Sequence, residues 1–124
     1  MKSIFSLHWL KSIQPRKQRK YRFNAPLHRK GSFLNAPLSK DLQQKHNVKT
    51  LRVRSGDRVK IQRGQFKSLE GEVSRVDVAR EKVYVSGAEL AKKDGGKVSY
   101  PIHASNVLIV SLKDDKRRMK KVNK

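Results

Sequence analysis

The chain has 124 residues, and its 31 lysines and arginines against 10 aspartates and glutamates give it a formal net charge of +21. This length allows one domain with extensions, and a hydrophobic content of 35% allows only a small buried core. The lack of cysteine excludes disulfides, cysteine-based zinc sites and thiol catalysis. The longest segment without a charged residue, 98–112, is shorter than the ~18 residues of a membrane-spanning helix, and residues 3–10 are followed by no signal-peptide cleavage site. We therefore expect an intracellular protein with a polyanionic partner and no membrane partner.

The surplus positive charge is concentrated at the two ends of the chain. Residues 1–50 carry a net charge of +11, residues 51–112 carry +5, and the short segment 113–124 carries another +5. The β-branched residues lie mainly in the middle segment. This distribution predicts a basic N-terminal extension over 1–50, a folded β domain over 51–112 and a basic C-terminal tail over 113–124.

The N-terminal extension contains five basic residues within seven positions, and aromatic residues lie among them. These residues are Arg16, Lys17, Arg19, Lys20 and Arg22, with Tyr21 and Phe23 as the aromatic members; His28, Arg29 and Lys30 continue the basic stretch. Such an arm is typical of segments that bind phosphates and fold only when their charge is neutralised, and its aromatic rings would either stack on unpaired bases or pack on the protein's own surface. A solvated basic tail or a localisation signal is the alternative.

A short helix is predicted over 39–46, between the arm and the β domain. Ser39 is suited to the N-cap position, and Asp41 would place a carboxylate in the first turn, where it meets the positive end of the helix dipole. Leu42 is expected to pack inward. The helix would lead the chain into the β domain.

Beyond residue 50 the apolar residues recur with a period of two, which predicts strands with one buried and one basic face. The apolar positions are Leu51, Val53, Val59 and Ile61, and the basic ones include Arg52, Arg54 and Lys60. A change of phase between Val73 and Val76 predicts a bulge near residues 74–75, beside the basic Arg75. Further strands are predicted over 82–85 and 107–110. Five short strands in this length predict a mainly β protein, a small antiparallel barrel.

A loop with two glycines connects the second and third predicted strands. Gly64 and Gly71 permit close approach of the backbone to a ligand, while Arg63 and Lys67 could place charge beside a phosphate. Phe66 is available either for stacking on a base or for packing. An ordinary hairpin loop with glycines at its bends is equally compatible with these residues.

The loop and its flanking strands resemble a known motif. Segment 56–61 (GDRVKI), with Gly64, Lys67, Gly71 and Val73, resembles the KOW motif of RNA-associated SH3-like barrels. Segments 15–21, 24–28 and 36–40 are similar to the N-terminal region of one KOW family, the large-subunit ribosomal protein twenty-four, numbered twenty-six in eukaryotes. The family usually has glycine where Ser68 stands and often a basic residue where Glu72 stands. Residues 1–13 have no recognised counterpart in it.

The resemblance implies an SH3-like KOW barrel and a structural constituent of the large ribosomal subunit in the cytoplasm. Its implied partners are large-subunit ribosomal RNA, bound early in assembly near the peptide exit tunnel, and neighbouring ribosomal proteins. A hairpin that projects near the tunnel in the family would occupy residues 87–97 here; a flexible loop is the alternative. A transcription-associated KOW protein or a histone-like nucleic-acid-binding protein is the competing function.

No enzymatic activity, metal, cofactor or small-molecule substrate is expected, because no carboxylate pair, His-Ser or His-Asp constellation or metal-ligand spacing stands out.

In the C-terminal tail, acidic residues at 114–115 precede basic ones, an order compatible with a short helix. Lys120 and Lys121 would then contact RNA; the alternative is a tail that is merely disordered and cationic. The complete set of expected RNA-binding residues is Arg16, Lys17, Arg19, Lys20, Tyr21, Arg22, His28, Arg29, Lys30, Arg52, Arg54, Lys60, Arg63, Gly64, Phe66, Lys67, Gly71, Arg75, Arg117 and Arg118.

Overall fold

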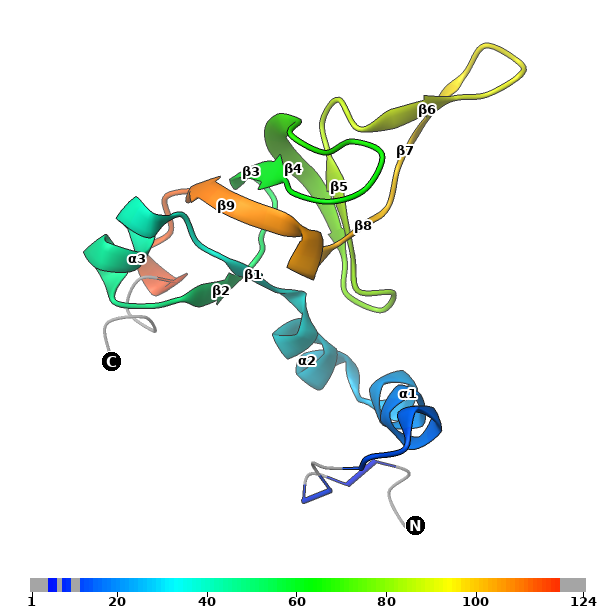
Figure 1. Ribbon diagram of the computed structural model, residues 1–124, viewed down its shortest axis with the longest axis vertical. Coiled ribbons are helices and arrows are strands. Elements are labelled where there is room, and N and C mark those ends of the chain that lie inside the picture. Colours follow the sequence, from blue (N-terminus) through cyan, green and yellow to red (C-terminus); the bar gives the residue numbers. More distant parts are fainter. Residues whose placement is uncertain (1–4, 7, 10–11, 119–124) are drawn as a thin grey trace.

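In the described residues, the secondary structure combines short helices, most of them in the first half of the chain, with nine strands. A computed structural model describes residues 5–6, 8–9 and 12–118 (Figure 1). The helical elements are α1 (Pro15–Asn24), α2 (Leu27–Lys30), α3 (Lys40–His46) and the 3₁₀ helices η1 (Gly31–Leu34) and η2 (Ala104–Asn106). The strands are β1 (Asn35–Pro37), β2 (Thr50–Arg52), β3 (Arg58–Ile61), β4 (Glu70–Asp77), β5 (Lys82–Val85), β6 (Glu89–Ala91), β7 (Lys97–Ser99), β8 (Ile102–His103) and β9 (Val107–Ser111).

The main sheet has five strands in the order β8-β5-β4-β3-β9, and all its strand pairs are antiparallel. In β3, Val59 and Ile61 are buried, whereas Arg58 is exposed on the opposite face, as the period of two predicts. The prediction of a mainly β, antiparallel fold is thus confirmed. The sheet is nevertheless not a closed barrel, because β8 and β9 remain its two edges and are joined through η2. With only two residues, β8 presents few backbone groups for closure.

A bulge in β4 bends the main sheet. The register between β4 and β5 shifts between Val73, which lies opposite Val85, and Arg75, which lies opposite Tyr84. The extra residue returns Val76 to the core side, where it packs against the buried cluster. The bulge predicted from the phase change near residues 74–75 is therefore confirmed.

The hydrophobic core also includes residues that precede the predicted β domain. Strand β1 pairs with β2 in a separate two-stranded sheet, and Leu38 forms a parallel bridge with Ile109 of β9. Core residues therefore extend beyond the segment 51–112. The core consists of Leu34, Ala36, Leu38, Val53, Val59, Ile61, Val73, Val83, Val85, Ala88, Ile102, Ala104, Val107 and Ile109.

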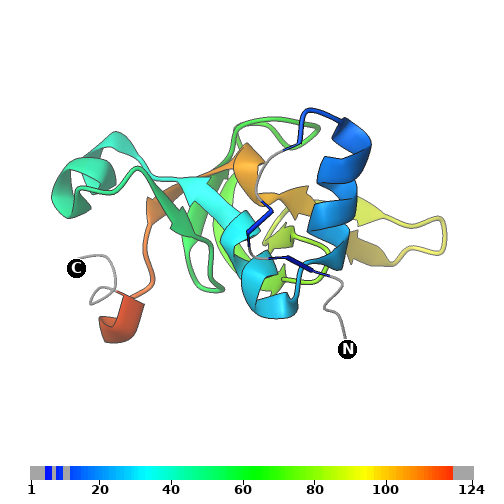
Figure 2. The ribbon, with the colours of Figure 1, turned by 90° about the horizontal axis from the view of Figure 1, so that it is seen from below.

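The helix predicted over 39–46 is present as α3. Ser39 precedes it in an extended conformation, although its side chain makes no capping hydrogen bond, and Asp41 lies in the first turn. The helix ends at His46, and the next residue, Asn47, caps it with a left-handed φ of 54°. Leu42 packs against the core, as expected. Helix α3 lies at the opposite end of the molecule from the β6–β7 hairpin (Figure 2).

Residues 15–24 of the arm form the helix α1, which the sequence does not predict. Pro15 begins α1, and proline is favoured at this position because its φ suits a helix and it has no N–H to leave unpaired. No residue of α1 is buried. The helix is attached to the sheet by Arg22, which forms an ion pair with Glu81 and whose guanidinium lies 4.8 Å from the centre of the Phe33 ring.

A hairpin is present close to the expected 87–97, but it spans 89–99 and is formed by β6 and β7, with Leu90 opposite Val98. It projects from the main sheet (Figure 1), and Gly95 at its tip has a φ of 89°. Both strands are exposed along their whole length. The segment is therefore a formed hairpin rather than an irregular loop.

The start of the C-terminal segment is bound to the core by a buried ion pair. The side chains of Asp57 and Arg118 are 0% and 3% exposed. The Nη1 atom of Arg118 donates to Oδ1 of Asp57 at 2.7 Å, and Nη2 donates to Oδ2 at 2.9 Å and to the carbonyl oxygen of Arg52 at 2.6 Å. Asp57 also accepts hydrogen bonds from the backbone N–H groups of Arg54 and Lys113. Arg118 therefore holds its own segment against the first turn of the β domain.

Candidate nucleic-acid interface

The outer face of α1 carries the densest group of accessible cations in the described part of the chain. Because an α-helix has 3.6 residues per turn, Arg16, Arg19 and Lys20 share one side, and Lys17 lies next to them. All four side chains are exposed, and none of them forms an ion pair with another described residue. These four residues, called the α1 cations below, can therefore offer their full charge to an external anion.

The remaining basic residues of the arm are used partly within the protein. Arg22 holds α1 against Glu81. Lys30 is half-buried; its Nζ donates to the carbonyl oxygen of Ala79 at 3.4 Å and lies 5.9 Å from the Phe23 ring centre. His28 is exposed and Arg29 is half-buried. Tyr21, also expected to contact RNA, packs against aromatic residues that precede α1.

The loop between β3 and β4 is a hydrogen-bonded turn with its charges outward. The N–H of Lys67 donates to the carbonyl oxygen of Gly64, and that of Ser68 donates to the carbonyl oxygen of Ile61. Arg63, Gly64 and Lys67 are exposed. Phe66 instead packs on Tyr100, with the ring centres 5.2 Å apart, and both rings border the core. The loop thus presents two cations while its aromatic residue contributes to packing.

Ser68 has a φ of 72°, in the left-handed region where the related family usually has glycine. We expect Ser68→Gly to raise the free energy of unfolding by up to about 1 kcal/mol, because relief of the left-handed strain outweighs the added freedom of the unfolded chain. Urea denaturation followed by circular dichroism measures this. In the matched control Ser99→Gly, where φ is not positive, the same substitution should destabilise the protein. Equal losses in the two variants would contradict this explanation.

Gly71 has a packing role at the base of the same loop. A Cβ added to it would lie 2.5 Å from the carbonyl oxygen of Ser86 and 2.9 Å from Cγ1 of Val85. We expect Gly71→Ala to destabilise the protein by about 1 to 3 kcal/mol, measured by urea denaturation, because the backbone at Ser86, just after β5, must move. The control Gly96→Ala meets nothing closer than 3.3 Å and should change stability by less than about 0.5 kcal/mol. An unaffected Gly71→Ala variant would show that no close approach is needed there.

A hollow of about 220 Å³ lies beside the loop and increases its cationic character. Besides loop residues and several apolar ones, its lining includes the polar side chains of Lys82 in β5, His103 in β8 and Asn106 in η2. Sequence reasoning did not include these three residues, because each is isolated in the sequence and only the sheet order brings it to the loop. The amide of Asn106, in one lining with the cations Arg63 and Lys82, is suited to a phosphate and its sugar.

The basic residues on the strands are largely paired within the protein. Arg58 and Lys60 lie 3.9 and 4.0 Å from the carboxylate of Glu70. Glu72, the departure from the family pattern, lies opposite Arg58 in the β3–β4 register. The guanidinium of Arg75 lies 4.3 Å from the centre of the Tyr84 ring. This face therefore carries less free positive charge than the alternating pattern predicts.

The basic residues near the buried ion pair also have contacts within the protein. The guanidinium of Arg52 lies against Gly31, and Arg54 forms an ion pair with Asp115. Burial alone would raise the pKa of Asp115, but the backbone N–H groups of Arg117 and Arg118 and the charge of Arg54 hold it below its ordinary value. The carboxylate therefore stabilises this segment at neutral pH, and the contribution is lost only as the pH falls through the lowered pKa.

The prediction that Arg118 contacts RNA needs correction, because its guanidinium is buried against Asp57 and cannot reach a phosphate. Arg117 is exposed. Lys120 and Lys121 lie outside the described residues. Among the described residues, no cluster of His, Asp or Glu is arranged to hold a metal ion, and no helix has the length and apolar character needed to cross a membrane.

The comparison with known protein families agrees with this arrangement of cations around a small β core. Residues 12–124 match the family described as ribosomal proteins L26 of eukaryotes and L24 of archaea. The match covers the α1 cations, the loop and the whole sheet, and it leaves out most of the segment before α1. The chain therefore belongs to this eukaryotic and archaeal family of ribosomal proteins, which are structural proteins of the large ribosomal subunit rather than enzymes.

Proposed function

We propose that the chain binds large-subunit ribosomal RNA through two surfaces, the α1 cations and the loop at 63–67 with the hollow beside it. The observation that carries this proposal is the difference in pairing: the α1 cations have no carboxylate partner among the described residues, whereas Arg22, Arg54, Arg58 and Lys60 do. Phosphates would supply the missing counter-charge and release bound counterions. Side-chain and backbone groups of the loop would then fix the orientation of the protein on the RNA.

We further propose that binding takes place early in assembly and near the peptide exit tunnel of cytoplasmic ribosomes. Family membership supports this placement, and the projecting β6–β7 hairpin provides an element that can extend beyond the RNA-bound core. Neighbouring large-subunit proteins are the proposed protein partners. Residues 89–91 and 97–99, which are exposed on both strands, are available to them.

The proposal is tested by filter binding of the full chain to purified large-subunit ribosomal RNA at a series of salt concentrations. If six to ten phosphates are contacted, affinity should fall by about 10³ to 10⁵ between ~50 and ~200 mM salt. Duplex DNA of random sequence is the competitor. Weaker competition by DNA than by unlabelled ribosomal RNA supports the proposal, and equal competition would favour a histone-like protein instead.

A further inference from the structure

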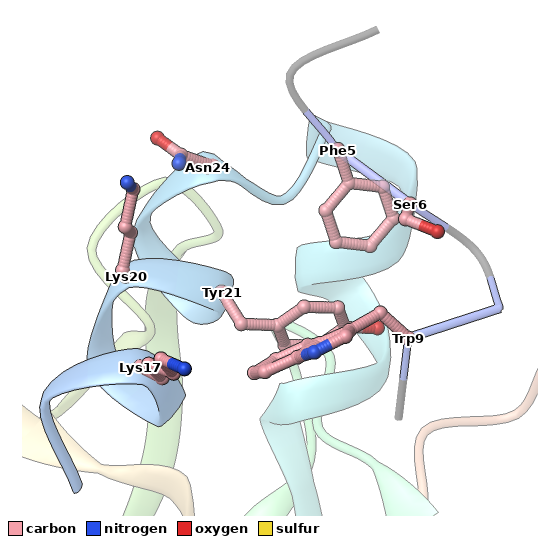
Figure 3. A pocket seen from close by; sticks show the side chains of 7 residues that line it. All are labelled: Phe5, Ser6, Trp9, Lys17, Lys20, Tyr21 and Asn24. Carbon is pink, nitrogen blue, oxygen red and sulfur yellow. The ribbon is translucent and has the colours of Figure 1, made fainter. Parts of the chain in front are cut away.

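A second recess lies beside α1, at the edge of the α1 cations. Tyr21 points from α1 toward two aromatic residues of the preceding segment (Figure 3). Its ring centre lies 4.9 Å from that of Phe5 and 5.2 Å from that of Trp9, with interplanar angles of 34° and 42°. The three rings border an open cavity of about 290 Å³, whose lining also includes Lys17, Lys20 and Asn24. We call this recess the aromatic pocket.

Part of the aromatic pocket lies outside the residues that match the family. The family match begins at residue 12, so Phe5 and Trp9 lie outside it. Trp9 is 36% exposed, which leaves part of the indole open to a ligand. Tyr21 thus links a segment without a family counterpart to the helix that carries the α1 cations.

The chemistry of the lining selects a particular ligand. Aromatic rings provide a stacking surface for a flat, apolar ring, and Lys17 and Lys20, three positions apart on one helix, supply two positive charges at its edge. Asn24 adds an amide that can both donate and accept hydrogen bonds. An apolar peptide would leave the lysines without counter-charge, and a free phosphate would not use the rings. A nucleotide uses both, and the cavity is near the lower end of ligand-site volumes, about 300 Å³.

We propose that the aromatic pocket binds one unpaired nucleotide of the RNA, with its base stacked on Trp9 and Tyr21 and its flanking phosphates on Lys17 and Lys20. This inference rests on the proposed function, because the RNA is the source of the nucleotide. It adds a base-stacking contact to an interface otherwise made of phosphate contacts. Sequence-tolerant binding of single strands is the expected result, since every base has a face that can stack.

Trp9 is the only tryptophan of the chain, so its fluorescence reports on the aromatic pocket directly. The full chain is titrated with a uridine hexanucleotide, an adenosine hexanucleotide and an abasic hexamer with the same phosphates. Both base-containing hexamers should quench Trp9 saturably, whereas the abasic hexamer should bind with little quenching. Equal quenching by the abasic hexamer, or hexamer binding without quenching, would overturn the proposal.

A variant and its matched control identify the stacking residue. Tyr21→Ala should weaken hexanucleotide binding, measured by anisotropy of a labelled strand, by about fivefold to a hundredfold. Phe23→Ala removes an aromatic side chain of the same helix that is 80% exposed and outside the aromatic pocket, and it should change binding by less than about twofold. Equal effects would contradict the proposal.

The experiments distinguish failure of the aromatic-pocket proposal from failure of the proposed RNA-binding function. Salt-dependent binding to ribosomal RNA with no response of Trp9 would refute the aromatic pocket alone. Absence of ribosomal RNA binding would refute the proposed function, whatever the hexamers do.

Discussion

Replacing Arg118 with methionine should lower the free energy of unfolding by about 3 to 5 kcal/mol, because it leaves the carboxylate of Asp57 buried without its ionic partner. Both side chains are almost completely inaccessible, and the guanidinium also donates to the carbonyl oxygen of Arg52. Methionine retains much of the aliphatic volume of arginine, so the effect reports on the lost charge and hydrogen bonds. Urea denaturation followed by circular dichroism measures the change.

Arg117→Met provides the matched control, since the neighbouring side chain is exposed. It should change stability by less than about 0.5 kcal/mol. The double variant Asp57→Asn/Arg118→Met should be more stable than Arg118→Met, because no unpaired charge remains buried. An Arg118→Met protein as stable as the control would show that the C-terminal segment does not contribute to the fold.

Neutralising the α1 cations should have the largest effect on RNA binding. In Arg16→Gln/Lys17→Gln/Arg19→Gln/Lys20→Gln, the slope of log affinity against log salt should become shallower by about 3, since each phosphate contact contributes about 0.7 to 0.9. The thermal unfolding midpoint should remain nearly unchanged, because the four side chains are exposed and glutamine is a good helix former. Filter binding to large-subunit ribosomal RNA and thermal denaturation provide the two measurements.

A control variant with substitutions in α3 and the loop after it shows whether RNA binding depends on where the cations lie or only on net charge. Lys40→Gln/Lys45→Gln/Lys49→Gln removes exposed cations that are not part of either proposed RNA-binding surface, and the slope should change by less than about 1. Equal losses per charge in the two variants would mean that net charge, not the position of α1, determines binding. A substantial drop in the unfolding midpoint of the α1 variant would instead make the α1 cations part of the fold.

Local patterns in the sequence predicted most of the sheet. Val59 and Ile61 follow the period of two that a half-buried strand requires, and the phase change after Val73 alone indicates the bulge. The helix at 40–46 was predicted because its capping and charge signals are local. The strand, the bulge and the helix could be predicted because each is determined by residues only a few positions apart in the sequence.

Features that depend on distant residues could not be predicted. Arg118 lies in the sequence context of a basic tail, and no nearby residue indicates that it forms a buried ion pair with Asp57, 61 positions earlier. Helix α1 was not predicted because its charge density is also typical of disordered arms, while its attachment depends on Glu81 in a distant turn. The sequence leaves Phe66 free to stack on a base. In the structure its ring packs on Tyr100, 34 positions later, and only the fold brings the two rings together.

In the candidate site, too, the residues that are neighbours in the sequence could be predicted, and those brought together by the fold could not. Arg16, Lys17, Arg19 and Lys20 were identified from their density alone, and the structure leaves all four exposed. The hollow beside the loop was missed because its polar residues come from three separate elements. The aromatic pocket was missed because residues 5 and 9 lie in a segment without a family counterpart.

The most direct test of the central claim, that this chain is an RNA-bound constituent of the large ribosomal subunit, is sucrose-gradient sedimentation of the tagged full chain from cell extract after a high-salt wash. The prediction is recovery in the large-subunit fraction, with loss from that fraction when the α1 cations are neutralised. Recovery only with chromatin or RNA polymerase, and none with the large subunit, would contradict it.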